Sequence, residues 1–178
     1  MDLQFEPIHP SLTPPVQGRP FSLGPYEVVD QRILDLIESC EAYIAHSECF
    51  TLPPRGFVTI HLDDGLLCNR AKLNMFIGTG LMSWFNPLPD YKNKKMSLTE
   101  IGSPYMSFSK EEVKLAHYNQ MRGDYIINPG IPHSFVNNSA CDCWVVSLAL
   151  LDKNTRDFLL FEDAIKSFNK YIKNEDQF

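Results

Sequence analysis

The sequence predicts a mainly β fold, an antiparallel barrel or sandwich with one α-helix before it and one after it in the chain. Between residues 57 and 151, short apolar runs alternate with Gly, Pro and Asn, which is typical of many short strands joined by turns. The segments on either side carry apolar residues at helical spacing. The 178 residues, 44% of them hydrophobic, fit one domain with a substantial core.

The first 25 residues differ from the rest, because they hold six of the 13 prolines. Proline lacks the backbone donor and cannot continue a helix or a central strand. We therefore expect residues 1–25 to form a proline-rich arm and residues 26–178 to form a single domain. The arm could wrap a neighbouring subunit, so a homo-oligomer joined through it is one interpretation.

Three segments are expected to be helical. Over residues 28–45, apolar side chains between Val29 and Ile44 recur on one helical face. Ser109 and Glu112 have the spacing of a capping box, which predicts a helical insertion over residues 109–121. A final amphipathic helix is predicted over residues 155–172, where aromatic and aliphatic side chains recur at helical spacing.

Six strands are expected between the first and the last of these helices. Each is a short apolar run bounded by turn residues. Their ranges are 57–62, 72–77, 81–85, 125–127, 133–136 and 144–150.

Two imidazoles and one carboxylate stand out within these strands. His61 and Asp63 are two residues apart, so on a strand their side chains point to the same side. His133 begins a later strand. Because this ligand set holds ferrous iron and leaves the opposite face of the ion open, the sequence predicts a metal centre with these three as the catalytic residues. Asp64 is the alternative carboxylate, although on a regular strand it faces away from His61.

The residues around His133 resemble a known motif. Residues 123–137 are similar to the second cupin motif, although one spacer residue between Pro129 and Gly130 is missing. The longer stretch 61–150 resembles the small Fe(II)- and 2-oxoglutarate-dependent oxygenases of the aspartyl/asparaginyl hydroxylase and JmjC-like type. Those proteins follow an H-x-D strand with an L-N-x-hydrophobic strand and a late P-H-S strand, to which Leu73–Phe76 and Pro132–Asn137 correspond.

The resemblance implies a double-stranded β-helix, also called a jelly roll or cupin fold. It further implies Fe(II) at the three predicted ligands, 2-oxoglutarate as cosubstrate, and hydroxylation of a peptide or a small molecule. Asn74 in the L-N strand, and Trp84 in a Ser-Trp-Phe triplet similar to that of the JmjC branch, are the implied cosubstrate-binding residues. Trp84 fits a place in the core as well.

One departure from this family concerns the far carboxylate of 2-oxoglutarate. Most relatives clamp it with an arginine about ten residues after the distal histidine, because the planar guanidinium suits a bidentate contact. Here residues 141–144 contain no basic residue, and Met82 stands where the JmjC branch has a lysine. We expect Lys72 to replace them, since it shares a strand face with Asn74. Arg70 and Arg122 are the alternatives.

Composition argues against several other classes of protein. The net charge of -6 disfavours a nucleic-acid groove. No apolar run is long enough for a membrane-spanning helix, and the first residues lack the features of a secretory signal. The five cysteines form no C-x-x-C pair, so we expect free thiols in a reducing, cytoplasmic compartment.

Two other functions fit the same residues. A cupin-type metal-dependent isomerase or lyase would keep the ligands without needing an oxo acid, which the missing arginine favours. A non-catalytic jelly-roll binding module that has lost its cosubstrate site would need neither the metal ligands nor an oxo acid.

Overall fold

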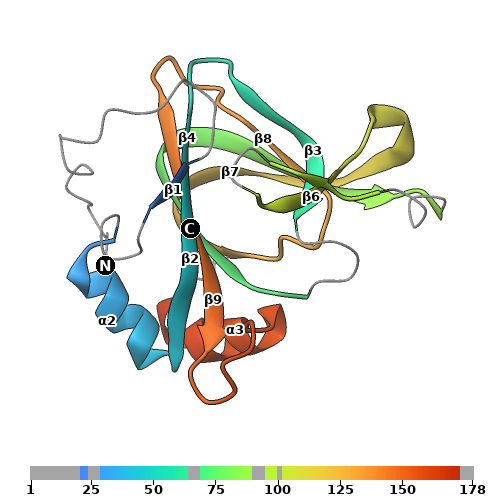
Figure 1. The fold of residues 1–178 in the computed structure, drawn as a ribbon. Helices are drawn as coiled ribbons and strands as arrows, with labels where there is room; N and C mark the ends of the chain where they lie inside the picture. The colour runs from blue at the N-terminus through green and yellow to red at the C-terminus, as the bar shows by residue number, and fades with distance from the viewer. Residues whose placement is uncertain (1–20, 24–28, 64–68, 90–94, 100–101, 173–178) are drawn as a thin grey trace.

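The computed structural model describes residues 21–23, 29–63, 69–89, 95–99 and 102–172. Within these residues, nine antiparallel strands form one sheet that curls upon itself (Figure 1). The strands are β1 (Phe21–Leu23), β2 (Ala42–Leu52), β3 (Phe57–Asp63), β4 (Lys72–Pro87), β5 (Ser97–Leu98), β6 (Pro104–Ser107), β7 (Val113–Ile127), β8 (His133–Val136) and β9 (Cys143–Asp152). Helices α2 (Gln31–Ser39) and α3 (Phe161–Phe168) flank the sheet in the chain. The predicted mainly β, double-stranded β-helix fold with a helix on either side is confirmed.

Strand β4 joins the two layers of the curled sheet. Its first half, residues 72–77, pairs with β9, whereas residues 81–84 pair with β8. Strand β7 borders β4 along both halves. The segments expected as separate strands at 72–77 and 81–85 are therefore one strand that changes partner. The expected strand 133–136 is confirmed as β8.

Two glycines allow β4 to bend where it changes partner. Gly78 has φ 108°, a backbone conformation that residues other than glycine rarely adopt. At Gly80, a Cβ atom would lie 2.8 Å from the carbonyl oxygen of Val136 and would also overlap the ring of Phe135. The pairing register with β7 shifts between Phe76 and Gly80, so the bend and the glycines coincide.

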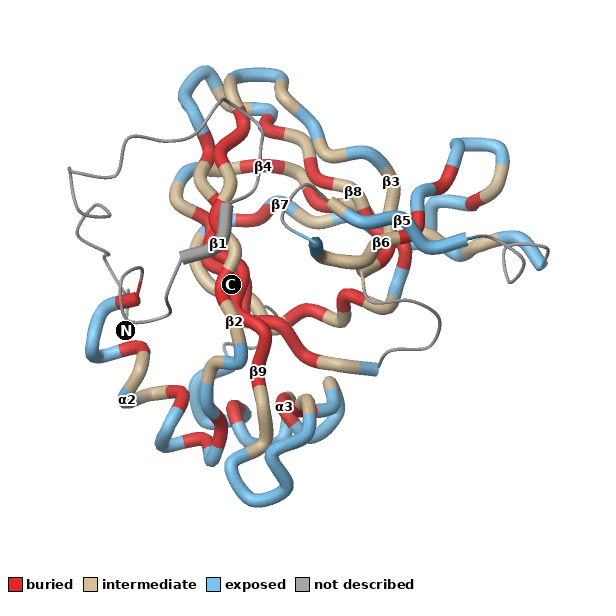
Figure 2. Tube along the Cα trace, in the orientation of Figure 1, coloured by how far each residue is buried: buried red, intermediate tan, exposed pale blue. Residues whose placement is uncertain are grey.

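The two helices cover the outer face of the layer that contains β2, β9 and β4. Ile33 and Ile37 of α2, and Phe168 of α3, belong to one buried cluster with Met75 of β4 and Leu148 of β9. Each such side chain contributes about 1.5–3 kcal/mol of transfer free energy. Figure 2 shows the buried residues running along β9 and recurring along α2. This cluster fixes which face of β4 and β9 points away from the helices.

The first helix is shorter than the expected 28–45. The Asp30 carboxylate accepts a hydrogen bond from the backbone N–H of Arg32 at 2.8 Å, which caps the start of α2. Ser39 is its last residue, and Glu41 adopts φ 56°. This left-handed residue ends the helix, and Ile44 lies in β2 instead.

The expected helix over residues 109–121 is wrong. The capping contact does form, because the Ser109 backbone N–H donates to Glu112 Oε2 at 2.7 Å. It starts only one 3₁₀ turn, Lys110–Glu112, and Val113 then opens strand β7. Pairing with β4 satisfies the backbone of β7 along most of its length, so tertiary pairing overrides the local signal.

The last helix is also shorter than the expected 155–172. It covers Phe161–Phe168, and a 3₁₀ turn, Asn169–Tyr171, follows it. Phe158 instead forms a β-bridge with Leu151, and the Arg70 guanidinium lies 3.9 Å from the centre of its ring. Phe158 therefore continues the helical spacing of apolar residues in the sequence, but it lies before the first residue of α3.

Most of the predicted arm, and Cys68, lie outside the described residues. Within the arm, Phe21–Leu23 forms β1 and pairs with β2 at one edge of the sheet. The four described cysteines are free thiols. No helix in the described ranges is long and apolar enough to cross a membrane. The single domain, the oligomer and the compartment stay predictions.

Replacing Gly80 by alanine tests the bend in β4. We expect Gly80→Ala to lower the free energy of unfolding by about 1–3 kcal/mol, because the added methyl group must displace Val136 or Phe135. Denaturant unfolding measures the loss. Thr79→Ala, one residue away and only half-buried, is the control and should cost less than about 1 kcal/mol. Equal losses in the two variants would contradict this account of the bend.

Candidate metal centre

A cavity of about 620 Å³ lies on the side of the sheet layer opposite the helices. Side chains from six strands, β2, β3, β4, β7, β8 and β9, and from a segment before and within β6 line it. They include His46, Glu48, Phe50, Val58, His61, Asp63, Lys72, Asn74, Phe76, Met82, Thr99, Ser103, Tyr105, His133, Phe135, Val145 and Ser147. On β2, on β9 and in the first half of β4 the lining residues are two apart, as strand alternation requires.

The three predicted ligands converge at one wall of this cavity. His61 and Asp63 are on β3, and His133 on β8 is directly opposite His61 in the pairing register. One ligand atom from each residue lies within 4.8 Å of the others, and His61 Nε2 is 3.4 Å from Asp63 Oδ1. The two imidazole ring centres are 4.5 Å apart. Together these three side chains could hold a divalent metal ion.

Both histidines are held by a hydrogen bond to a backbone carbonyl two residues earlier. His61 Nδ1 is 2.8 Å from the oxygen of Thr59, and His133 Nδ1 is 2.8 Å from the oxygen of Ile131. A carbonyl oxygen can only accept, so each Nδ1 carries the proton. In a neutral imidazole this leaves the lone pair on Nε2, the arrangement that orients histidines as metal ligands.

The surroundings shift the pKa values of the three side chains in different directions. Burial lowers the pKa of His133 to about 4, and the His61 charge adds to this effect. Burial also acts to lower the pKa of His61, but the hydrogen bond and charge of Asp63 outweigh it and raise that pKa. Burial alone would raise the pKa of Asp63, yet the charge of Lys72 and the two imidazoles hold it well below its usual range. At neutral pH the site therefore presents an uncharged imidazole, His133, beside an ionised carboxylate.

Lys72 points into the cavity and is already paired there. Its Nζ lies 2.8 Å from Asp63 Oδ2 and 3.9 Å from Glu48 Oε2. Glu48 in turn accepts a hydrogen bond from the hydroxyl of Ser103. The result is a chain of largely buried charges that leads across the cavity from the three candidate ligands His61, Asp63 and His133, the metal-ligand group.

Asn74 also faces the cavity, as its parity with Lys72 predicts. Asn74 is 7% exposed, and its Oδ1 has no hydrogen-bond partner among the described residues. A buried polar atom without a partner is costly, so this amide is available to a bound molecule.

Trp84, the third predicted cosubstrate residue, is placed differently. It pairs with His133 across the strands, but its ring stacks on His117, with ring centres 5.4 Å apart. Trp84 is absent from the residues that line the cavity. Trp84 thus makes a packing contact, which agrees with the alternative interpretation that it is a core residue and not a cosubstrate-binding residue. His117 itself is exposed.

The alternative basic residues do not reach the cavity. Arg70 contacts the ring of Phe158, and Arg122 is exposed on β7. Asp64, the alternative carboxylate, lies outside the described residues. Among the lining residues that the structure describes, Lys72 is therefore the one lysine or arginine.

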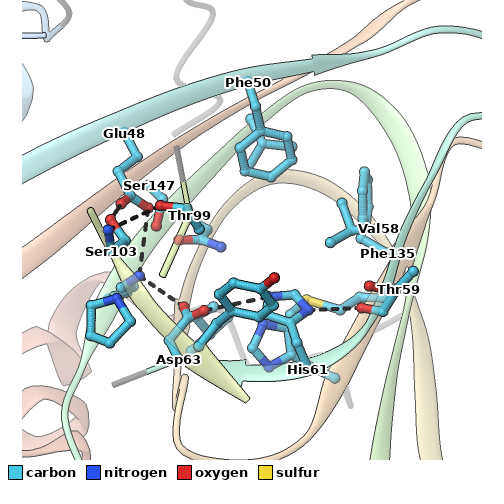
Figure 3. Close-up of a pocket in the computed structure, with 18 of the residues that line it drawn as sticks. Glu48, Phe50, Val58, Thr59, His61, Asp63, Thr99, Ser103, Phe135 and Ser147 are labelled. Carbon is cyan, nitrogen blue, oxygen red and sulfur yellow. Dashed lines mark hydrogen bonds and ion pairs between the residues drawn. The ribbon is translucent and has the colours of Figure 1, made fainter. Parts of the chain in front are cut away.

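Strands β2 and β9 provide the opposite wall of the cavity, which the sequence patterns did not predict. Figure 3 shows Glu48, Ser103 and Ser147 on one side of the metal-ligand group, and Val58 and Phe135 on the other. His46, Glu48 and Phe50 alternate along β2, but this short alternation directly follows the segment expected to be helical, and no strand was predicted there. The cavity thus has a polar half and an apolar half.

Comparisons with known proteins give weak likenesses only. No family model matches the sequence, and no curated protein matches it. Similar solved structures include an oxalate oxidase with glycolate (14% identity, TM-score 0.40, 79% of this chain and 57% of that chain) and vicilin from Capsicum annuum (15%, 0.41, 82% and 30%). An oxalate decarboxylase variant from Bacillus subtilis is a third (13%, 0.34, 67% and 26%). The chain spans little more than half of the first of these proteins and less than a third of the other two, and TM-scores this low assign it neither a family nor an activity.

Breaking the buried ion pair tests the electrostatics of the site. We expect Lys72→Met to lower the free energy of unfolding by about 3 kcal/mol at neutral pH, because Asp63 is left buried without its partner. Asp63 has a depressed pKa in the folded protein, so its pairing stabilises above the unfolded pKa of about 4 and is lost as the pH falls below it. The difference between variant and wild type should therefore shrink in acid.

The double variant Lys72→Met with Asp63→Asn is the matched control. It removes both charges, so it should recover part of the loss measured at neutral pH. A loss that is independent of pH and of Asp63 would mean that Lys72 acts through packing alone.

Proposed function

We propose that this chain is a metal-dependent enzyme of the non-heme iron type, with Fe(II) held by His61, Asp63 and His133. The observation that supports this most is their convergence at the wall of a cavity, with both histidines oriented through Nδ1 by backbone carbonyls. Two imidazoles and one carboxylate are the ligand set of ferrous oxygenases. The carbonyl contacts are the outer interactions that such ligands require.

The proposed reaction is oxygen-dependent hydroxylation coupled to decarboxylation of a 2-oxo acid. Dioxygen, the 2-oxo acid and a C–H bond give carbon dioxide, an acid shorter by one carbon, and an alcohol. When bound, ferrous iron supplies open coordination positions for the oxo acid and dioxygen. The resemblance in sequence implies 2-oxoglutarate as this acid, and a small molecule or a peptide side chain as the hydroxylated substrate.

This chain's own residues would bind and orient the reactants. Asn74 offers an amide within the cavity, and Phe50, Phe76 and Phe135 form an apolar wall that excludes water. Lys72 holds the Asp63 carboxylate in place through its ion pair. These tasks of positioning and exclusion are what a protein contributes to cofactor chemistry.

A second candidate is metal-dependent chemistry without an oxo acid. The observation that favours it is the pairing of Lys72 with two carboxylates, since the described cavity lining offers no other lysine or arginine for a dicarboxylic cosubstrate. An isomerase or lyase acting on a small molecule would need the metal and the cavity alone.

Metal binding tests the ligand assignment. We expect the purified protein to bind one Mn(II), a redox-inert substitute for Fe(II), in calorimetric titration. Replacing His133 by alanine should weaken binding by at least about a hundredfold, because a buried neutral ligand is lost. His117→Ala removes an exposed histidine and is the control, with binding unchanged. Tight Mn(II) binding by the His133→Ala variant would refute the site.

Absorption spectroscopy separates the two candidate functions. Under anaerobic conditions, Fe(II) and a 2-oxo acid together should give a weak charge-transfer band, because the band requires the oxo acid to chelate the metal. Admitting oxygen should then consume the oxo acid. If the protein binds the metal but gives no band with any 2-oxo acid, the oxygenase proposal fails and the second candidate stands.

A further inference from the structure

We infer that the cavity selects a 2-oxo acid with a single carboxylate and an apolar side chain over a dicarboxylate, and that Glu48 sets this preference. The inference rests on the proposed metal centre and narrows its cosubstrate to one chemical class. It rests on three observations of the cavity lining: its charge balance, the pairing of Lys72, and the division into a polar and an apolar half.

The charge balance favours a monoanion. The described cavity lining holds two carboxylates, Glu48 and Asp63, one ammonium, Lys72, and three histidines, His46, His61 and His133. His61 and His133 must be neutral to bind a metal, and the two carboxylates and the ammonium carry one net negative charge between them. A divalent ion makes the total one net positive charge, which a single carboxylate neutralises. A second carboxylate would leave a net negative charge in a poorly solvated space, which is unfavourable.

The pairing of Lys72 leaves a second carboxylate without a cation. Its ammonium contacts Asp63 at 2.8 Å and has Glu48 at 3.9 Å, and the Lys72 side chain is only 9% exposed. An incoming carboxylate at Lys72 would lie beside the Glu48 carboxylate. Like charges at such distances repel strongly where water is scarce, so Glu48 acts against a dicarboxylate.

The apolar half of the cavity suits the side chain of the preferred acid. The rings of Phe76 and Phe135 have centres 5.0 Å apart, and Phe50 and Val145 extend this wall. Burying an aliphatic or aromatic substituent there would gain about 25 cal/mol for each Å² removed from water. The amide of Asn74 is a neutral partner for the single carboxylate or keto oxygen.

Calorimetric titration of the Mn(II)-loaded full-length protein tests this preference without relying on turnover. The probes are 4-methyl-2-oxopentanoate and phenylpyruvate, compared with 2-oxoglutarate. We expect at least one of the apolar acids to bind about tenfold tighter than 2-oxoglutarate or better, a difference in binding free energy of about 1.4 kcal/mol. Equal or tighter binding of 2-oxoglutarate would overturn the inference.

Replacing Glu48 tests its role. Glu48→Gln keeps the shape of the side chain but removes its charge. The ratio of the affinity for the apolar acid to that for 2-oxoglutarate should therefore fall by about tenfold. Glu162→Gln removes the same charge from the exposed face of α3 and should leave the preference as it is. An unchanged preference in Glu48→Gln would refute the role of Glu48, and should that variant not fold, the comparison of acids on the wild-type protein still decides the inference.

Titrating Mn(II) first separates the two levels of proposal. If Mn(II) does not bind, the metal centre itself fails, and the cosubstrate class falls with it. If Mn(II) binds but neither apolar acid does, the metal centre stands and the inferred class of acid is wrong.

Discussion

Strands β4 and β9 present one set of side chains to the helices and the other set to the cavity. Leu73 and Met75 belong to the cluster beneath α2 and α3, whereas Lys72, Asn74 and Phe76 line the cavity. A slip of one residue in register would exchange the two sets and bury polar groups in the core. The free energy of packing the helices therefore also fixes which residues face the metal-ligand group, and stability and site geometry depend on one register.

The second constraint is the cost of placing charges inside the barrel. Asp63 is ionised within a poorly solvated wall, and it is compatible with folding because Lys72 and His61 lie against it. That compensation commits Lys72 to the carboxylate of Asp63. A lysine held in this way is a poor anchor for a distant anionic group, so the contact that stabilises the candidate metal ligand also weakens the case for 2-oxoglutarate.

Local patterns predicted that His61, Asp63 and His133 could converge, which the structure shows, but they predicted the surroundings of these residues poorly. His61 and Asp63 share a strand face through spacing alone, and His133 follows a proline-glycine turn that marks the start of its strand. Strand β7 was not predictable in this way, because the capping contact of Ser109 and Glu112 is genuine and only pairing with β4 overrides it. The same limit hid Glu48, whose position depends on the pairing of β2 with β9, far away in the sequence.

The two histidines make the same kind of backbone contact, but their pKa values shift in opposite directions because their neighbours differ. Burial and the charge of His61 lower the pKa of His133 to about 4, so His133 is neutral at neutral pH. His61 lies 3.4 Å from Asp63, which raises its pKa. A divalent ion held by Nε2 of His61 and the carboxylate of Asp63 would compete there with the proton that Asp63 favours on His61. The geometry that brings these side chains together would then also couple metal binding to pH, because the ion would have to release that proton.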